Sequence, residues 1–176
     1  LVLFSVGGYL LIQAFFQSSY EREVVNAGEE NQMLQYSFAA AWNTTVQSAD
    51  SLEVQAEQAA RAMSEQMSGN RVRIRLSDSE KRVLYDSTQA GPDTGLLSQV
   101  EPGKQGHMLR RNGEGYELQT ASVIELDEGF LYLESIRDIS GLFSERDAQY
   151  HIYMRWLFWV LLAQSICCYV LAIWLM

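Results

Sequence analysis

Histidine, glycine and cysteine are the residues of this sequence whose spacing could indicate catalysis, and they argue against an enzyme. Each of the two histidines, His107 and His151, is followed by an apolar residue, so neither has the adjacent acidic residue of a kinase phosphoacceptor motif. The segment Gly113–Gly115 lacks the third glycine of a dinucleotide-binding fingerprint. Two distant histidines without nearby cysteines do not form a zinc site. We therefore predict no catalytic site and no cofactor.

Carboxylates gather at one predicted hairpin tip, where Glu125, Asp127 and Glu128 lie within four positions. Carboxylates grouped in this way can hold a divalent cation or attract a cationic peptide, and the alternative is an ordinary solvated turn. We predict no metal site. If the chain does bind a metal ion, these three carboxylates are the candidate ligands. Three arginines between residues 71 and 76 form the opposite case, a basic edge that blunts a sheet edge or pairs with neighbouring acids.

Charge divides the chain into three parts. The 176 residues include 13 basic and 22 acidic side chains, a net charge of −9, and all of them lie between Glu21 and Arg155. A negative middle region would repel phosphates, which excludes a nucleic-acid partner. Because 48% of the residues are hydrophobic and only two are proline, disorder is excluded as well. We expect a polar domain over residues 17–155, flanked by two apolar segments.

The two flanking segments have the composition of membrane-spanning helices. Residues 156–176 carry no charge, and at about 1.5 Å per residue they would span about 30 Å, the thickness of a bilayer core; a buried core helix is the alternative. Residues 1–16 are equally apolar, begin with Leu, and lack the basic region and cleavage site of a signal peptide. We predict a transmembrane helix truncated at its start, in a longer multi-pass plasma-membrane protein that contacts the lipid bilayer and holds residues 17–155 outside the cytoplasm.

The region after the first segment has helical periodicity. We predict one long amphipathic helix over residues 17–69, which packs its alanine-rich stripe on a sheet or pairs in a homodimer. The apolar positions recur every three or four residues, at Leu34, Phe38, Trp42, Val46, Ala49, Leu52, Ala56, Ala59, Met63 and Met67.

Beyond Asn70 the apolar period changes to two, which predicts a sheet over residues 70–138. Strands are expected at 71–76, 82–85, 106–111, 116–126 and 130–137, with Val72, Ile74 and Leu76 inward and the three arginines outward. Residues 87–105 predict a loop with one helical turn near 95–100. A signal helix over 139–155 is expected to run unbroken into 156–176. The fold class is therefore α+β, a five-stranded antiparallel sheet with the long helix on one face.

This order of elements resembles the extracellular PAS-like fold, of the single Cache type, found in bacterial membrane sensors. Residues Ser77–Ser87 look like the first hairpin of that family, and Glu134–Ser140 with Phe143, Glu145 and Arg146 is similar to the sheet-to-membrane junction of Gram-positive sensor histidine kinases. The resemblance implies the sensor region of a two-component histidine kinase, which relays ligand binding through the second transmembrane helix to a kinase and its cytoplasmic response regulator.

The resemblance also implies that a small molecule binds between the sheet and the loop that crosses it, and the acidic hairpin tip leaves a cation or a peptide as the alternative signal. Arg137 could clamp a carboxylate ligand with two hydrogen bonds, or else pair with Asp138, Asp86 or Glu134. For Tyr116 and Tyr132 the alternative is a place in the core, and for His107 it is an exposed position at the start of a strand. Transferred residue by residue, the candidates are Tyr85, Asp86, His107, Arg110, Tyr116, Tyr132 and Arg137.

Two other functions stay open on the sequence. The same sensor region could belong to a chemoreceptor or to a cyclic-nucleotide signalling enzyme. Alternatively, the chain could be a membrane adaptor whose loop domain binds a partner protein, in which case side chains should fill the space between sheet and loop.

Overall fold

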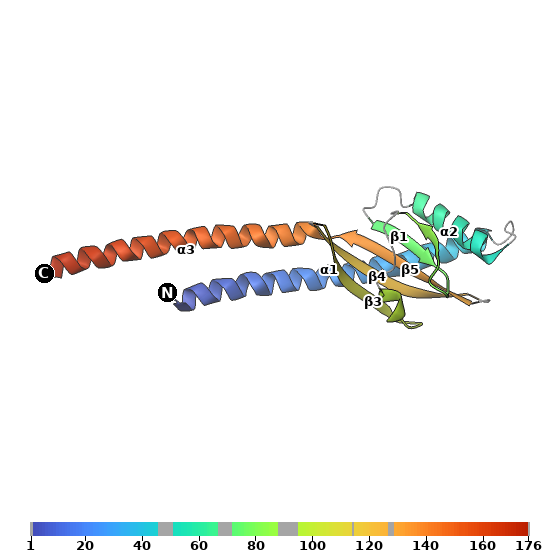
Figure 1. Ribbon diagram of the computed structural model, residues 1–176, viewed down its shortest axis with the longest axis horizontal. Coiled ribbons are helices and arrows are strands. Elements are labelled where there is room, and N and C mark those ends of the chain that lie inside the picture. Colours follow the sequence, from blue (N-terminus) through green and yellow to red (C-terminus); the bar gives the residue numbers. More distant parts are fainter. Residues whose placement is uncertain are drawn as a thin grey trace. The chain divides into compact units, whose positions relative to one another are not determined.

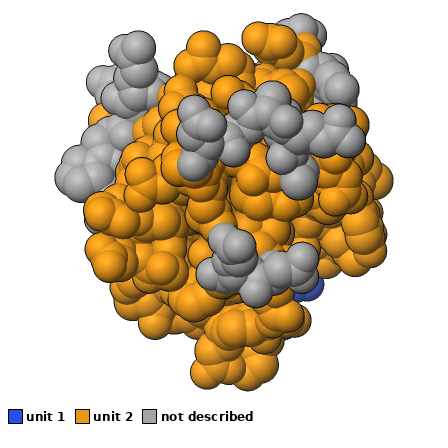
Figure 2. Space-filling view, turned by 90° about the vertical axis from the view of Figure 1, so that its right-hand side faces the viewer, with its two compact units in different colours: residues 1–21, 141–176 blue, residues 22–140 orange. Residues whose placement is uncertain are grey.

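The structure, a computed structural model, describes residues 2–45, 51–66, 72–87, 95–113, 115–126 and 129–175. It divides into two compact units, which Figure 2 colours separately: one holds Leu1–Glu21 and Gly141–Met176, the other Arg22–Ser140. The fold class is α+β, as predicted. Its elements are α1 (Val2–Thr45), α2 (Leu52–Gln66), β1 (Val72–Ser77), β2 (Val83–Asp86), the short 3-10 helix η1 (Leu96–Ser98), β3 (Gln105–Asn112), β4 (Gly115–Leu126), β5 (Gly129–Asp138) and α3 (Ser140–Leu175).

The five strands form one antiparallel sheet in the order β2-β1-β5-β4-β3, which confirms the predicted sheet. Alternation gave each strand to within about two residues, since apolar side chains must repeat every second position to share a face. The turn between β3 and β4 contains Gly113, whose φ of 62° favours glycine. The last strand, β5, lies in the middle of the sheet between β1 and β4.

One face of the sheet, here called the helix face, is covered by the Arg22–Thr45 part of α1 and by α2 (Figure 1). The small alanines of α2 let its backbone approach β1 and β2 closely. The buried core of this face consists of Leu34, Phe38, Ala41, Ala56, Ala59, Ala60, Met63, Ile74, Leu76, Ile124, Leu131 and Leu133.

The prediction of a single helix over residues 17–69 is wrong, because α1 ends at Thr45 and α2 begins at Leu52. A straight helix over that range would be about 80 Å long, whereas a six-residue strand such as β1 spans about 20 Å. Two shorter helices can place both halves of the apolar stripe on the same sheet, so Leu34 and Met63 share one core. The stripe positions Val46, Ala49 and Met67 lie outside the described residues.

The opposite face, here called the loop face, is also covered, and this overturns part of the strand prediction. Ile74 and Leu76 point into the helix-face core as expected, but Arg75 is only 1% exposed instead of facing solvent. Alternation predicts exposure only when one face of a sheet is open to water. Here η1 and the residue Val100 cover β3, β4 and β5 in a second apolar cluster with Met108, Ala121, Val123 and Tyr132.

The unit made of the chain's first and last helical segments contains the most apolar helix. Within the described residues, α3 is the helix long and apolar enough to cross a membrane. No residue of its most apolar 18-residue stretch is buried. The segment that begins α1 runs antiparallel to α3 in this unit (Figure 1). The Tyr153 hydroxyl donates to the Ser5 carbonyl at 2.8 Å, and a Cβ on Gly8 would lie 2.4 Å from the Tyr153 ring. The missing side chain of Gly8 therefore permits this close contact.

Candidate functional site

The loop face carries a buried set of polar side chains, here called the charge network: Arg75, Asp86, Gln119 and Glu134. Arg75 Nε donates to Asp86 Oδ2 at 3.2 Å, and Arg75 Nη1 lies 3.7 Å from Glu134 Oε2. The Gln119 amide donates to the Glu134 carboxylate. The side chains of Arg75 and Glu134 are 2% and 0% exposed, and that of Asp86 is 16% exposed. The network is therefore almost free of water, with its one partly open side at Asp86.

Strand register brings these residues together. Arg75 of β1 stands opposite Asp86 of β2 on one side and opposite Glu134 of β5 on the other. Cross-strand partners in an antiparallel pair share a face and have neighbouring side chains. One guanidinium is thus held between two carboxylates from different strands, and charge attraction across β1 fixes both neighbours.

A buried guanidinium with two carboxylates can exchange partners without leaving a charge alone. Removing either sign from such a network is costly, because the remaining charge stays buried without compensation. A ligand that carries a carboxylate would compete with Asp86 or Glu134 for Arg75, and a cationic ligand would compete with Arg75 for the carboxylates. Either exchange would alter the contact between β1 and β5.

A second row of charges borders the network on the same face. Arg73 donates to the Glu117 carboxylate, and Asn112 Nδ2 donates to Glu117 Oε1 at 2.9 Å. Burial raises the pKa of Glu117, but the hydrogen bonds from Arg73 and Asn112, with the charges of Arg73 and Arg110, together lower that pKa below its ordinary value. Glu117 is therefore held as a carboxylate.

The remainder of the loop face is apolar and tightly packed around Gly106. A Cβ at this position would lie 2.8 Å from Val100 Cγ2 and 3.2 Å from Leu96 Cδ1. Glycine at this point lets the η1 region sit directly on β3. Leu96 and Leu97 are fully covered in this arrangement, so described side chains fill this half of the loop face.

The seven predicted ligand-binding residues do not form one site. By strand alternation and register, Asp86, Arg110 and Tyr132 belong to the loop face, where only Asp86 is part of the charge network. The other four belong to the helix face or its edge: Tyr85, His107, Tyr116 and Arg137.

Arg137 is held by two carboxylates of α1. Its Nη1 lies 3.1 Å from Glu23 Oε2 and its Nη2 lies 3.1 Å from Glu30 Oε2. These partners differ from Asp138, Asp86 and Glu134, the alternatives expected from the sequence. Burial raises the pKa of Glu30, the charge of Arg137 lowers it and that of Glu23 raises it, and the net result is a raised pKa. Arg137 thus ties α1 to β5 with both arms of its guanidinium.

The predicted acidic cluster is described only in part. Glu125 is exposed at the end of β4, while Asp127 and Glu128 lie outside the described residues. Among the residues that the structure describes, no three His, Cys, Asp or Glu side chains are placed to hold a metal ion together.

Hydrogen bonds fix the junction between the sheet and α3. Ile139 N donates to the Tyr116 carbonyl at 2.9 Å, and Tyr116 N donates to Ser140 Oγ at 2.8 Å. Ser140 N donates to Asp138 Oδ1 at 2.8 Å, which satisfies a backbone donor at the start of the helix. The first residue of α3 is therefore tied to both β4 and β5.

Of the charge network, only Asp86 was predicted as a site residue: Arg75 was expected to face solvent, Glu134 was named only as an alternative partner of Arg137, and Gln119 was not singled out. A usable sign was the position of Glu134 within the apolar run Leu131–Ile136, because an acid in a central strand needs a buried partner.

Compared with known proteins, the chain matches no protein-family profile and no curated protein. The function therefore rests on the geometry described above.

Proposed function

We propose that this chain is the extracytoplasmic sensor region of a membrane-anchored signalling protein, and that α3 carries its output. The observation that supports this most is chain continuity. The central strand β5 contributes Glu134 to the buried network, and a single residue, Ile139, separates β5 from α3. Since α3 is one uninterrupted 36-residue helix that follows β5 in the chain, the proposed output is a displacement of β5 that shifts the start of α3.

The exposure of α3 supports the membrane anchor. Large apolar side chains of its second half are mostly uncovered, including Trp156, Trp159 and Trp174 at 68%, 57% and 83% exposure. A core helix of a soluble protein would bury such residues, whereas a bilayer accepts them, with tryptophan at the interfaces. Residues 156–176 are the proposed second span.

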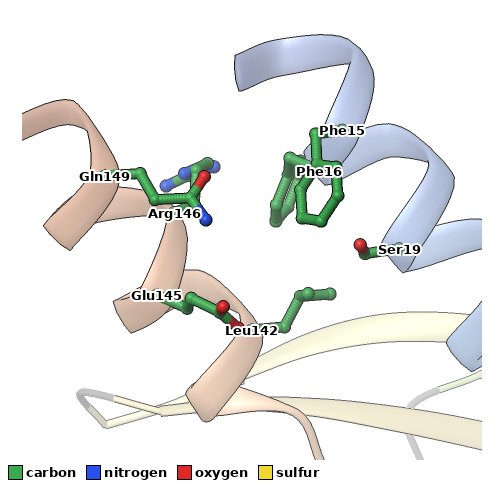
Figure 3. A pocket seen from close by; sticks show the side chains of 7 residues that line it. All are labelled: Phe15, Phe16, Ser19, Leu142, Glu145, Arg146 and Gln149. Carbon is green, nitrogen blue, oxygen red and sulfur yellow. The ribbon is translucent and has the colours of Figure 1, made fainter. Parts of the chain in front are cut away.

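The first span is proposed for residues 1–16, which are free of charge and pack against α3 in the same compact unit. Figure 3 shows Phe16 of α1 and Arg146 of α3 facing each other across a narrow crevice. The Arg146 guanidinium carbon lies 4.7 Å from the Phe16 ring centroid and 5.2 Å from that of Phe143. The crevice holds about 10 Å³, room for one water molecule at most, so α1 provides a close partner against which α3 can shift.

The proposed trigger is partner exchange in the charge network. A charged ligand that reaches the partly open side at Asp86 would weaken the link between Arg75 and the carboxylates around it. Only a ligand with different affinities for the two arrangements can shift their populations. Movement of Glu134 would then move β5, and the hydrogen bonds of Ser140 would pass that movement to α3.

The proposed parent protein is a PAS-like sensor histidine kinase that functions as a homodimer and acts on a response regulator. The observed order is two helices, two strands, η1, three strands and a helix, and from β1 onward it agrees with the order on which the resemblance to the single Cache type rests. The same geometry would serve a chemoreceptor or a cyclic-nucleotide enzyme. Coding sequence that follows residue 176 tests this choice, because a kinase requires a phosphoacceptor histidine with an adjacent acidic residue.

A membrane adaptor is the second candidate, favoured by one observation. The described residues Leu96, Leu97 and Val100 fill the apolar half of the loop face, as expected if no small molecule binds there. The two candidates differ in their dependence on Asp86: a sensor's output should change in Asp86→Asn, whereas an adaptor's partner binding should not.

Cysteine labelling of intact cells tests the membrane arrangement. In a Cys167→Ser/Cys168→Ser background, a membrane-impermeant maleimide should label Arg111→Cys, an exposed position of β3, without cell lysis. Val2→Cys and Leu175→Cys should be labelled only after lysis. Labelling of either end position in intact cells, with the other protected, would contradict two spans.

A further inference from the structure

A groove on the helix face, between α1 and the β3 edge of the sheet, has the properties of a second binding site. It encloses about 310 Å³, at the small end of the range for small-molecule sites. Val24, Val25 and Glu29 line it from α1, and Gln105, His107 and Thr120 line it from the sheet. It lies on the face opposite the charge network, and it does not depend on the proposed sensor function.

Thr120 gives the groove an unused polar group. Thr120 is only 2% exposed, and its hydroxyl has no hydrogen-bond partner among the described residues. Buried hydroxyl groups are nearly always paired, because leaving one unpaired costs its lost contact with water. Thr120 stands opposite His107 in the register of β3 and β4, so the two side chains are neighbours. The hydroxyl oxygen itself has almost no accessible surface, so a ligand atom in the groove would complete the pairing after a rotation of the Thr120 side chain.

Gly28 of α1 and Gln105 of β3 meet at the edge of the groove. The Gly28 carbonyl accepts a hydrogen bond from Gln105 Nε2 at 3.2 Å, and a Cβ at Gly28 would lie 3.0 Å from Gln105 Oε1. That atom is the far end of a flexible, exposed side chain, so a larger residue at position 28 would displace the Gln105 amide by a few tenths of an ångström.

The lining identifies the class of ligand. Of the residues that line the groove, none is Lys or Arg, and Glu29, the one carboxylate, is exposed to solvent. A carboxylate ligand would find no fixed cation and a cationic ligand only a solvated acid. Valine side chains offer an apolar wall, while Thr120, His107 and Gln105 offer hydrogen bonds. We propose that the groove binds a small neutral molecule with an apolar body and a hydroxyl or amide group that hydrogen-bonds to Thr120.

Three molecules of nearly equal shape test the proposal: benzamide, benzoate and benzamidine. The full chain in detergent micelles is titrated with each, and methyl NMR signals of Val24, Val25 and Thr120 are followed. Benzamide should give saturable shifts at these methyls, with an affinity at least tenfold higher than that of the anion or the cation. Equal or tighter binding of benzoate or benzamidine overturns the proposal, as does the absence of saturable shifts with benzamide.

Variants separate the groove from general effects. Thr120→Val keeps the shape of the side chain and removes the hydroxyl, and it should weaken benzamide binding about tenfold. Thr44→Val, whose hydroxyl donates to the Ala41 carbonyl outside the groove, serves as the matched control and should bind as the parent does. If Thr120→Val alters the fold, His107→Ala at an exposed position should still weaken binding about threefold. Unchanged affinity in both groove variants overturns the proposal.

Discussion

The two faces of the sheet are covered by different chemistry. On the helix face, α1 and α2 bury aliphatic and aromatic side chains such as Leu34, Phe38 and Met63. On the loop face, the same strands bury Arg75 and Glu134 beside a small apolar cluster under η1. Apolar packing is non-directional and tolerates small shifts, whereas a buried ion network has a few discrete arrangements. The comparison indicates that apolar packing on the helix face holds the domain together, and the loop face is where the proposed switch would act.

The largest effect should follow from breaking the network. Arg75→Met leaves Asp86 and Glu134 without their guanidinium and should lower the free energy of unfolding by about 3–5 kcal/mol. Urea titrations of the full chain in detergent measure it through Trp42, which packs against the helix-face core, with the tryptophans at 156, 159 and 174 replaced by Phe.

Two further variants sharpen this measurement. Arg75→Met/Glu134→Gln removes both buried charges and keeps an acceptor for Gln119, so it should recover at least half of the loss. Arg73→Met breaks a pair whose guanidinium is 35% exposed, and it should cost much less. A loss in Arg75→Met no greater than that in Arg73→Met would show that burial does not strengthen the network.

The second effect belongs to the helix face. Leu34→Ala removes a fully buried side chain from the core between α1, α2 and the sheet, and it should lower the free energy of unfolding by about 3 kcal/mol. Met33→Ala, one position earlier on the same helix and 64% exposed, should change stability by less than about 0.5 kcal/mol. The stability lost in Arg75→Met can be recovered by removing a second charge, whereas the loss in Leu34→Ala should not be recoverable in that way.

The same contrast explains which parts of the fold could be predicted from the sequence. Alternation located the strands and the inward positions Ile74 and Leu76, because burial on the helix face is apolar and periodic. Arg75 follows the same alternation, so the pattern predicts that its side chain faces solvent. Its burial depends on register with Asp86 and Glu134, a long-range property that local periodicity does not contain. The break between α1 and α2 was hidden for a similar reason, since the stripe continues across it.

The third effect concerns the apolar half of the loop face. Gly106→Val would place side-chain atoms against Val100 and Leu96, and overpacking of this kind costs about 1–3 kcal/mol. We expect the η1 region to move while the sheet stays intact. Protease susceptibility near residues 96–104 should rise, and Gly141→Val, a position with open space around its Cβ, should leave that susceptibility unchanged. If Gly106→Val resists protease near residues 96–104 as well as the parent chain does, the placement of η1 does not depend on its contact with β3.

The smallest effect is a difference in the sign of two pH dependences. The pKa of Glu117 on the loop face is lowered, so the folded chain binds fewer protons there than the unfolded chain. Its stabilisation is complete above the ordinary pKa of 4.5 and is lost as pH falls through the folded value. The pKa of Glu30 on the helix face is raised, so the folded chain retains a proton longer, and stability falls as pH rises from 4.5 through the folded value.

Each glutamate's share can be read from a neutral variant. The stability difference between the parent chain and Glu117→Gln should grow in favour of the parent as pH rises from about 3 to about 5, whereas the corresponding difference for Glu30→Gln should move against the parent as pH rises above 4.5. Only the slopes are compared, because Glu30→Gln also removes one of the two carboxylates on Arg137. Slopes of the same sign would contradict the physical distinction on which the comparison rests: at Glu117 hydrogen bonds to the carboxylate outweigh its burial, and at Glu30 burial outweighs the attraction to Arg137.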